Sequence, residues 1–188
     1  MRYPTGNGGS DTSDGQGRVS AQVDADEITG RIATLLIANG ATVAVAETSA
    51  GGMISGALLG VPGASAWFGG GVIPYTAQVR EAWLGLGADA FGQDGAVSAA
   101  AAVRLAEAVR AVSGTTWGLA ETGIAGPQSG RRSSKPAGLA FVAVAGPIPT
   151  PIVIEVRTGL DGRRENQEAF TSASLRAFLK VLESVPSQ

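Results

Sequence analysis

The chain has 188 residues, 44% of them hydrophobic, and a net charge of -2, which fits one globular domain with its own core. It contains neither Cys nor His, so disulfides, thiolate nucleophiles, zinc–cysteine sites and a Ser-His-Asp triad are excluded. The near-neutral charge, without a basic stripe, argues against nucleic-acid binding. Because Cys and His are absent, any hydrolytic chemistry must use hydroxyls, carboxylates, Lys or Tyr.

The N-terminal segment is rich in Gly, Ser and Asp and cannot bury enough apolar surface to offset its ordering entropy. We predict a disordered tail over residues 1–22 and one folded domain over residues 23–188. No apolar run approaches membrane-spanning length, and the N-terminus lacks the pattern of an export signal. The expected protein is cytoplasmic, with no membrane partner.

The first predicted helix has apolar residues at helical spacing, can be capped by Asp24 or Asp26, and ends at Asn39-Gly40. Residues 41–46 are apolar and partly β-branched, which predicts a buried strand. Residues 47–52 then form a turn into a second helix. This strand-to-helix turn carries the first motif discussed below.

Residues 66–76 predict a loop that leads into a strand, and Pro74 favours either an edge position for that strand or the end of the strand. A short helix around Trp83 follows. Ser98 suits the N-cap of an Ala-rich helix that ends at Gly114, and its many Ala residues indicate close packing on a sheet.

Three strands and a long helix complete the pattern, over residues 116–120, 137–145, 152–157 and 164–185. The last two strands are joined by a Pro-rich turn, which predicts a neighbouring pair, whereas the earlier strands are separated by helices. This combination predicts an α/β fold, a three-layer α/β/α sandwich around a mixed sheet.

Four groups of short motifs follow one another along the chain, in segments 46–52, 66–80, 95–98 with 122–127, and 135–138 with 158–164. They resemble A-E-S-C-T-G-G, W-F followed by Y-S-N-x-x-K, G-A-V-S with S/T-G-I-A-G-P, and K-P-x-G with a disturbed G-D-R segment. These motifs, in this order, are those of the nicotinamide-nucleotide amidohydrolase family, the CinA C-terminal-domain proteins. The resemblance covers nearly the whole chain after residue 25.

The resemblance implies hydrolysis of the carboxamide of nicotinamide mononucleotide, which gives nicotinic acid mononucleotide and ammonia in pyridine-nucleotide salvage. In the family, the Ser of A-E-S attacks the amide, and the Lys of Y-x-N-x-x-K activates this Ser. The expected partner is a small-molecule nucleotide, and no cofactor or metal is expected. The resemblance also suggests a homodimer or a larger homo-oligomer.

The chain departs from the family at the reacting positions. Thr48 replaces the Ser, Ser49 the Cys, Ala77 the Asn and Arg80 the Lys. Thr48 keeps a hydroxyl, but its methyl group restricts the rotamer and crowds attack. A guanidinium stays protonated, so Arg80 cannot take the hydroxyl proton as a Lys could. The candidate catalytic residues are Thr48, Ser49, Tyr75 and Arg80.

The candidate substrate-binding residues lie on the same segments and are Glu47, Gly51, Gly52, Thr122, Gly123, Ile124, Ala125, Gly126, Lys135 and Arg163. Gly-rich turns can aim backbone N–H groups at an oxyanion or a phosphate. Glu47 either orients a catalytic group or stabilises a helix N-terminus. Lys135 is either a substitute base or a solvated, phosphate-facing cation. Arg163 either binds the nucleotide phosphate or lies at the start of the last helix without a ligand.

Three functions stay open at this point. The first is an amidohydrolase in which Thr48 or Ser49 attacks and Tyr75 or Lys135 assists proton transfer. The second is a catalytically inactive homologue that binds a pyridine nucleotide or acts as an assembly partner. The third is a related amide or nucleotide hydrolase with another substrate. Release of ammonia from nicotinamide mononucleotide discriminates the first from the second.

Overall fold

The computed structural model describes residues 13–127 and 134–185. Within these residues, five strands form one sheet in the order β2 (Phe68–Val72), β1 (Val43–Glu47), β3 (Trp117–Ile124), β4 (Leu139–Ala145) and β5 (Ile152–Arg157). Strand β1 is parallel to both of its neighbours, whereas β3, β4 and β5 pair antiparallel. The predicted mixed sheet is confirmed, and so are the edge position of the Pro74 strand and the pairing of the last two strands.

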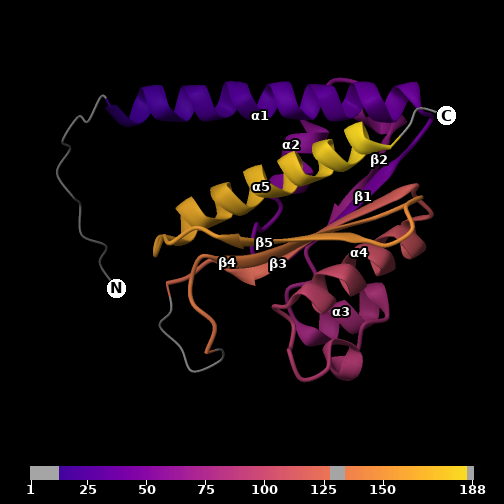
Figure 1. The fold of residues 1–188 in the computed structure, drawn as a ribbon, viewed down its shortest axis with the longest axis vertical. Coiled ribbons are helices and arrows are strands. Elements are labelled where there is room, and N and C mark those ends of the chain that lie inside the picture. The colour runs from indigo at the N-terminus through magenta and orange to yellow at the C-terminus, as the bar shows by residue number, and fades with distance from the viewer. Residues whose placement is uncertain (1–12, 128–133, 186–188) are drawn as a thin grey trace, which may run out of the picture.

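Helices cover both faces of this sheet (Figure 1). On one face lie α1 (Ser13–Ala38), α2 (Met53–Leu59) and α5 (Arg163–Ser184), and on the other lie α3 (Ala77–Leu84) and α4 (Ala99–Ser113). Two 3-10 turns, η1 (Ala64–Ala66) and η2 (Ala88–Phe91), precede β2 and α4. The three-layer α/β/α sandwich predicted from the sequence is therefore the observed architecture.

Alternating residues of β1 and β3 supply two separate cores. Val43, Val45 and Leu119 belong to the cluster under α1 and α5, whereas Ala44, Ala46 and Ala120 belong to the cluster under α4. The small residues on the α4 side let that helix approach the sheet closely. A Cβ added at Gly118 of β3 would stand 2.0 Å from the Ala106 carbonyl oxygen of α4.

The first helix is longer than the sequence pattern indicates. It begins at Ser13, so residues 13–22, which composition assigns to a disordered tail, are helical, and Asp24 and Asp26 lie inside the helix rather than at its cap. Helix propagation explains this difference, because extending a formed helix adds one hydrogen bond for each residue fixed. Residues 1–12 of the predicted tail lie outside the described residues. The predicted end is confirmed by the positive φ of Gly40.

The second half of the chain agrees closely with its pattern. Ser98 caps α4 by accepting a hydrogen bond from the Ala101 backbone nitrogen, and Gly114 follows the helix in a left-handed conformation. Strand β3 extends to Ile124, beyond the predicted end at residue 120, so motif residues 121–124 belong to the sheet. Among the described residues, no helix is long and apolar enough to cross a membrane.

Candidate active site

The candidate site lies where β1 and β3 end side by side. These strands are parallel, and Ala46 pairs with Ala120 and Glu47 with Glu121. The turn after β1 and the segment after β3 therefore emerge at the same edge of the sheet. In open α/β sheets, ligands bind in the crevice outside the carboxyl ends of the strands.

Glu47 is fully buried and caps the second helix. Its carboxylate accepts hydrogen bonds from the backbone nitrogens of Ile54 (3.0 Å) and Ser55 (2.9 Å), and from the Ser55 hydroxyl (2.6 Å). Gly52, the N-cap residue of α2, has no side chain that could do this. Of the two roles open to Glu47, the structure thus supports stabilisation of the helix N-terminus. Its role in binding substrate stays a prediction.

Glu121 is a residue that motif comparison missed. It is fully buried, and its Oε2 accepts hydrogen bonds from the backbone nitrogens of Thr48 (3.2 Å), Ser49 (2.9 Å) and Ala50 (2.9 Å). Burial raises the pKa of Glu121 to about 7, the charge of Glu47 acts in the same direction, and the three hydrogen bonds oppose both. A carboxylate inside the apolar strand 117–124 was the signal that could have revealed it.

The Ser49 hydroxyl joins the two segments. It donates to the Gly123 carbonyl oxygen and accepts from the Gly123 nitrogen at 3.1 Å, and the residue is only 6% exposed. The Ser49 carbonyl in turn accepts from Nε2 of Gln167 on α5 at 3.0 Å. Both capacities of this hydroxyl are thus used to hold the turn against β3.

The Thr48 hydroxyl, in contrast, is loosely held. Its Oγ1 lies 3.4 Å from the Thr122 hydroxyl and 3.5 Å from the Glu121 carbonyl oxygen, both long for hydrogen bonds between these groups. Thr122 Oγ1 itself donates to the Ala96 carbonyl oxygen at 2.6 Å. Thr48 is half-buried, so its hydroxyl is the more available nucleophile of the adjacent pair.

Lys135 is anchored next to the residue that holds Thr122. Its ammonium nitrogen donates to the carbonyl oxygens of Asp94, at 2.8 Å, and Val97, whereas Thr122 bonds to the intervening residue Ala96. Segment 94–97 therefore brings a cation toward the hydroxyl pair. In both bonds the side chain of Lys135 acts as a donor, and its role as a substitute base stays a prediction.

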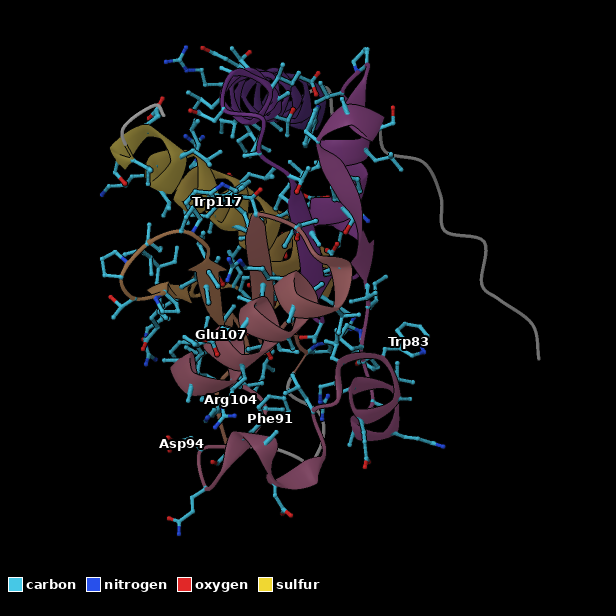
Figure 2. The ribbon with its side chains drawn as sticks, turned by 90° about the vertical axis from the view of Figure 1, so that its right-hand side faces the viewer. Trp83, Phe91, Asp94, Arg104, Glu107 and Trp117 are labelled. Atoms are coloured by element: carbon cyan, nitrogen blue, oxygen red, sulfur yellow. The ribbon has the colours of Figure 1, made fainter. Side chains whose placement is uncertain are left out.

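Tyr75, just before α3, and Arg80, within that helix, form a separate arrangement. Arg80 donates from Nη1 to the Tyr75 carbonyl oxygen at 3.3 Å, and its guanidinium lies 5.3 Å from the centroid of the Phe91 ring. Burial lowers the pKa of Arg80, yet a guanidinium remains protonated in proteins. Tyr75 is 60% exposed, and Trp83 points outward from α3 (Figure 2). The structure thus gives Arg80 a packing role as a cation.

The segment after β3 is held by the start of α5. Buried Asn166 donates to the carbonyl oxygens of Ala125 (3.0 Å) and Leu160 (2.9 Å), and Arg163 donates to that of Gly126 at 3.1 Å. Asn166 is a second residue that motif comparison missed, because its role depends on where α5 lies. The Ile124 carbonyl accepts from the Gly138 nitrogen at 2.9 Å, which ties this segment to the start of β4.

Two glycines permit the shape of the first turn. Gly51 and Gly52 have φ values of 70° and 99°, in the left-handed region that other residues rarely adopt. The structure therefore brings together the turn, Thr122, Gly123 and segment 94–97 with Lys135. Within residues 13–127 and 134–185, no group of three or more His, Cys, Asp and Glu side chains could hold a metal ion.

Sequence comparisons place most of the chain within one known family. Residues 25–182 match the family model of the CinA C-terminal domain. A CinA-like protein of Frankia casuarinae is 39% identical over 162 residues, covering 86% of this chain and 36% of that protein. A CinA-like protein of Anaeromyxobacter dehalogenans is 40% identical over 150 residues, covering 80% of this chain and 36% of that protein. The chain thus spans about a third of the length of these curated relatives.

Solved structures agree with this match. Competence/damage inducible protein CihA from Agrobacterium tumefaciens superposes with a TM-score of 0.78 at 34% identity, over 86% of this chain and 96% of that one. Competence damage-inducible protein A from Klebsiella pneumoniae superposes with a TM-score of 0.79 at 23% identity, over 86% and 99%. The second similarity supports the fold alone.

Proposed function

We propose that this chain, which belongs to the CinA C-terminal domain family, hydrolyses the carboxamide of nicotinamide mononucleotide to nicotinic acid mononucleotide and ammonia. The choice of substrate rests on the motif resemblance. The chemistry rests on one observation, the loosely bonded Thr48 hydroxyl at the shared end of β1 and β3. A homo-oligomeric state and a cytoplasmic location stay predictions.

Thr48, and not Ser49, is the proposed nucleophile. A hydroxyl that attacks a carbonyl must be able to leave its ground-state hydrogen bonds and reach the substrate. Ser49 would have to give up its bonds to both backbone groups of Gly123, and it is almost inaccessible. Thr48 would give up only contacts of 3.4 Å and 3.5 Å.

The proposed reaction has two halves. Thr48 Oγ1 forms a bond to the carboxamide carbon, the hydroxyl proton is transferred to the amide nitrogen, and the C–N bond breaks to release ammonia. Water then attacks the threonyl ester, which releases the carboxylic acid and returns a proton to Thr48. Thr122 orients the attacking hydroxyl, and the Lys135 ammonium stabilises negative charge that develops on the carboxamide oxygen.

Ammonia release from nicotinamide mononucleotide tests this proposal directly. Thr48→Val keeps the shape of the side chain but removes its hydroxyl, so turnover should fall by on the order of a thousandfold or more. Thr48→Ser should retain or increase turnover, because it removes the methyl group that crowds attack. The matched control is Thr34→Val, which removes an exposed hydroxyl on α1 and should change nothing. Equal turnover by Thr48→Val and the unaltered protein would refute the assignment.

The arrangement of Arg80 favours a second candidate, an inactive homologue that binds the nucleotide. Its guanidinium cannot act as a base, and it is engaged with the Tyr75 carbonyl and the Phe91 ring. Calorimetry distinguishes the two candidates, because this one predicts binding of nicotinamide mononucleotide without ammonia release. The double variant Arg80→Lys Thr48→Ser would then gain activity. Failure of pyridine nucleotides to bind would remove both candidates.

A further inference from the structure

The carboxylates that end β1 and β3 are unequally satisfied. Both oxygens of Glu47 accept hydrogen bonds, whereas Glu121 receives all of its bonds on Oε2. Its Oε1 is buried and has no hydrogen-bond partner among the described residues. Buried carboxylate oxygens are normally paired, so this arrangement is unfavourable for stability and calls for a functional explanation.

Glu121 reaches Thr48 only through the backbone. Along β3, side chains alternate between the faces, and Glu121 continues the row of Trp117 and Leu119, which faces α1 and α5. Thr122 lies on the opposite face, where its hydroxyl contacts Ala96 and the Thr48 hydroxyl. The Glu121 carboxylate is therefore no proton acceptor for that hydroxyl, and its influence passes through the N–H groups of the turn.

The three N–H groups that meet at Oε2 fix the conformation of the turn. Successive backbone N–H groups point at one atom only when their residues form a concave, nest-like turn. The N–H groups of Ser49 and Ala50 come within 2.9 Å of Oε2. Their convergence sets the direction of the Thr48 Cα–Cβ bond, and hence the 3.4 Å contact between the Thr48 and Thr122 hydroxyls.

The strength of this clamp depends on the charge of Glu121. An ionised carboxylate binds N–H groups about twice as strongly as a neutral acceptor. From β1 the charged neighbour is Glu47, β4 presents Val142, and segment 53–59 contains no charged residue. From α5, the uncharged side chains Asn166, Gln167 and Phe170 face the turn and the neighbouring segment. The cation Arg163 binds the Gly126 carbonyl oxygen. No cation contributes to the pKa shift of Glu121, so its carboxylate is protonated as the pH falls through about 7, and protonation weakens the clamp.

We propose that Glu121 is a positioning residue for the reaction proposed above, and that its ionised carboxylate gathers the N–H groups of residues 48–50 to hold the Thr48 hydroxyl in attacking position. This inference rests on the proposed function for its catalytic consequence. The clamp itself is a property of the fold and can be measured without substrate.

The kinetic test uses Glu121→Gln, which keeps the size and one accepting oxygen but cannot ionise. One pH unit above neutrality, kcat for nicotinamide mononucleotide should fall by about tenfold to a hundredfold, since small misplacements of reacting groups have effects of this size. KM should change by less than about twofold. The unaltered enzyme should gain kcat as pH rises through about 7, and this rise should be absent in the variant.

Two further variants make this test specific. Ser55→Ala removes a hydroxyl that donates to Glu47 and not to Glu121, so it should leave kcat unchanged one pH unit above neutrality. Glu121→Asp keeps the charge but shortens the side chain, so it should lower kcat and retain a rise with pH. A Glu121→Gln protein with undiminished kcat and an intact pH-dependent rise would overturn the proposal, and so would loss of that rise in Glu121→Asp.

Amide hydrogen exchange separates failure of this inference from failure of the proposed function. If the unaltered protein releases no ammonia at any pH, the proposed function fails. In that case the amides of Ser49 and Ala50 should still exchange at least about tenfold faster in Glu121→Gln than in the unaltered protein. Unchanged exchange at these two amides would overturn the clamp.

Discussion

The two ends of the β1–β3 pair each carry a pair of threonines, but they use them differently. At the amino end, Thr42 and Thr116 exchange hydrogen bonds, each backbone nitrogen donating to the other's hydroxyl at 3.1 Å. At the carboxyl end, Thr48 and Thr122 have only a 3.4 Å contact between hydroxyls. The first pair is a closed structural link, and the second leaves a hydroxyl available for chemistry.

The charges at the two ends differ in the same sense. The bonds between Thr42 and Thr116 are neutral, whereas the carboxyl end buries Glu47 and Glu121 beside each other and leaves one Glu121 oxygen unpaired among the described residues. A fold that is optimised only for stability would avoid the second arrangement. Of the two ends of this strand pair, the one where the motif residues meet carries the unfavourable electrostatics.

The largest effect is expected for turnover, when one threonine at a time is replaced by valine at the two ends of the β1–β3 pair. Thr48→Val should lower turnover of nicotinamide mononucleotide by on the order of a thousandfold or more, because it removes the proposed nucleophile. Thr42→Val should leave turnover within about twofold, because its hydroxyl serves only the structural link. Steady-state ammonia release by both variants measures this contrast. Equal losses at the two ends would abolish the distinction between them.

The next effect concerns stability and pH. Because the pKa of Glu121 is raised from 4.5 to about 7, the folded chain binds more protons than the unfolded chain between these values, and this group lowers the free energy of unfolding as pH rises through that window. Glu121→Gln should remove this loss, which is on the order of 3 kcal/mol. Denaturant unfolding of both proteins at a pH below 4.5 and one above 7 measures it. A stability difference that does not vary with pH would contradict the prediction.

A smaller effect is expected where α5 supports the carboxyl end. Asn166→Ala leaves the Ala125 and Leu160 carbonyl oxygens without their amide donor, so the free energy of unfolding should fall by about 2 kcal/mol. Binding of the mononucleotide should also weaken. Thermal unfolding and calorimetry measure the two effects. The control is Arg176→Ala, which removes an exposed hydrogen bond to Ser172 on the same helix. A loss of stability without any change in affinity would show that Asn166 supports the fold and not nucleotide binding.

The smallest effect is expected for stability at the amino end. Thr42→Val removes the acceptor for the Thr116 nitrogen, which is partly buried, and should lower the free energy of unfolding by about 1 kcal/mol. The backbone bond from the Trp117 nitrogen to the Thr42 carbonyl, at 2.8 Å, should survive. Urea unfolding measures the change. A cost above that of Asn166→Ala would show that the amino end is the more critical of the two.

Local patterns in the sequence predicted most elements of the fold. Alternating or continuous apolar runs identified the strands, and the pairs Asn39-Gly40 and Ser98 with Gly114 marked helix boundaries by their capping chemistry. The start of α1 was predicted wrongly, because a polar segment can continue a helix whose later turns pack on the core. Strand β3 exceeded its predicted end, because its motif residues pair with β4.

The candidate site was only partly predictable. The motifs identified Thr48 and Thr122, but sequence could not rank Thr48 above Ser49, since the difference lies in bonds to Gly123. Glu121 and Asn166 belong to no motif that was recognised. Their roles depend on contacts between residues more than 40 positions apart, 73 for the Glu121–Thr48 bond and 41 for the Asn166–Ala125 bond.

The sequence by itself determined the fold class, the absence of His and Cys chemistry, and a guanidinium at position 80, because these follow from residue types and local periodicity. Only the tertiary structure decided which hydroxyl is loosely bonded, what Glu47 and Glu121 bind, and which carbonyl oxygens Lys135 binds. Those properties depend on burial and on hydrogen bonds between strands that are adjacent in space and distant in sequence. The sequence records the donors and acceptors, and folding determines how they pair.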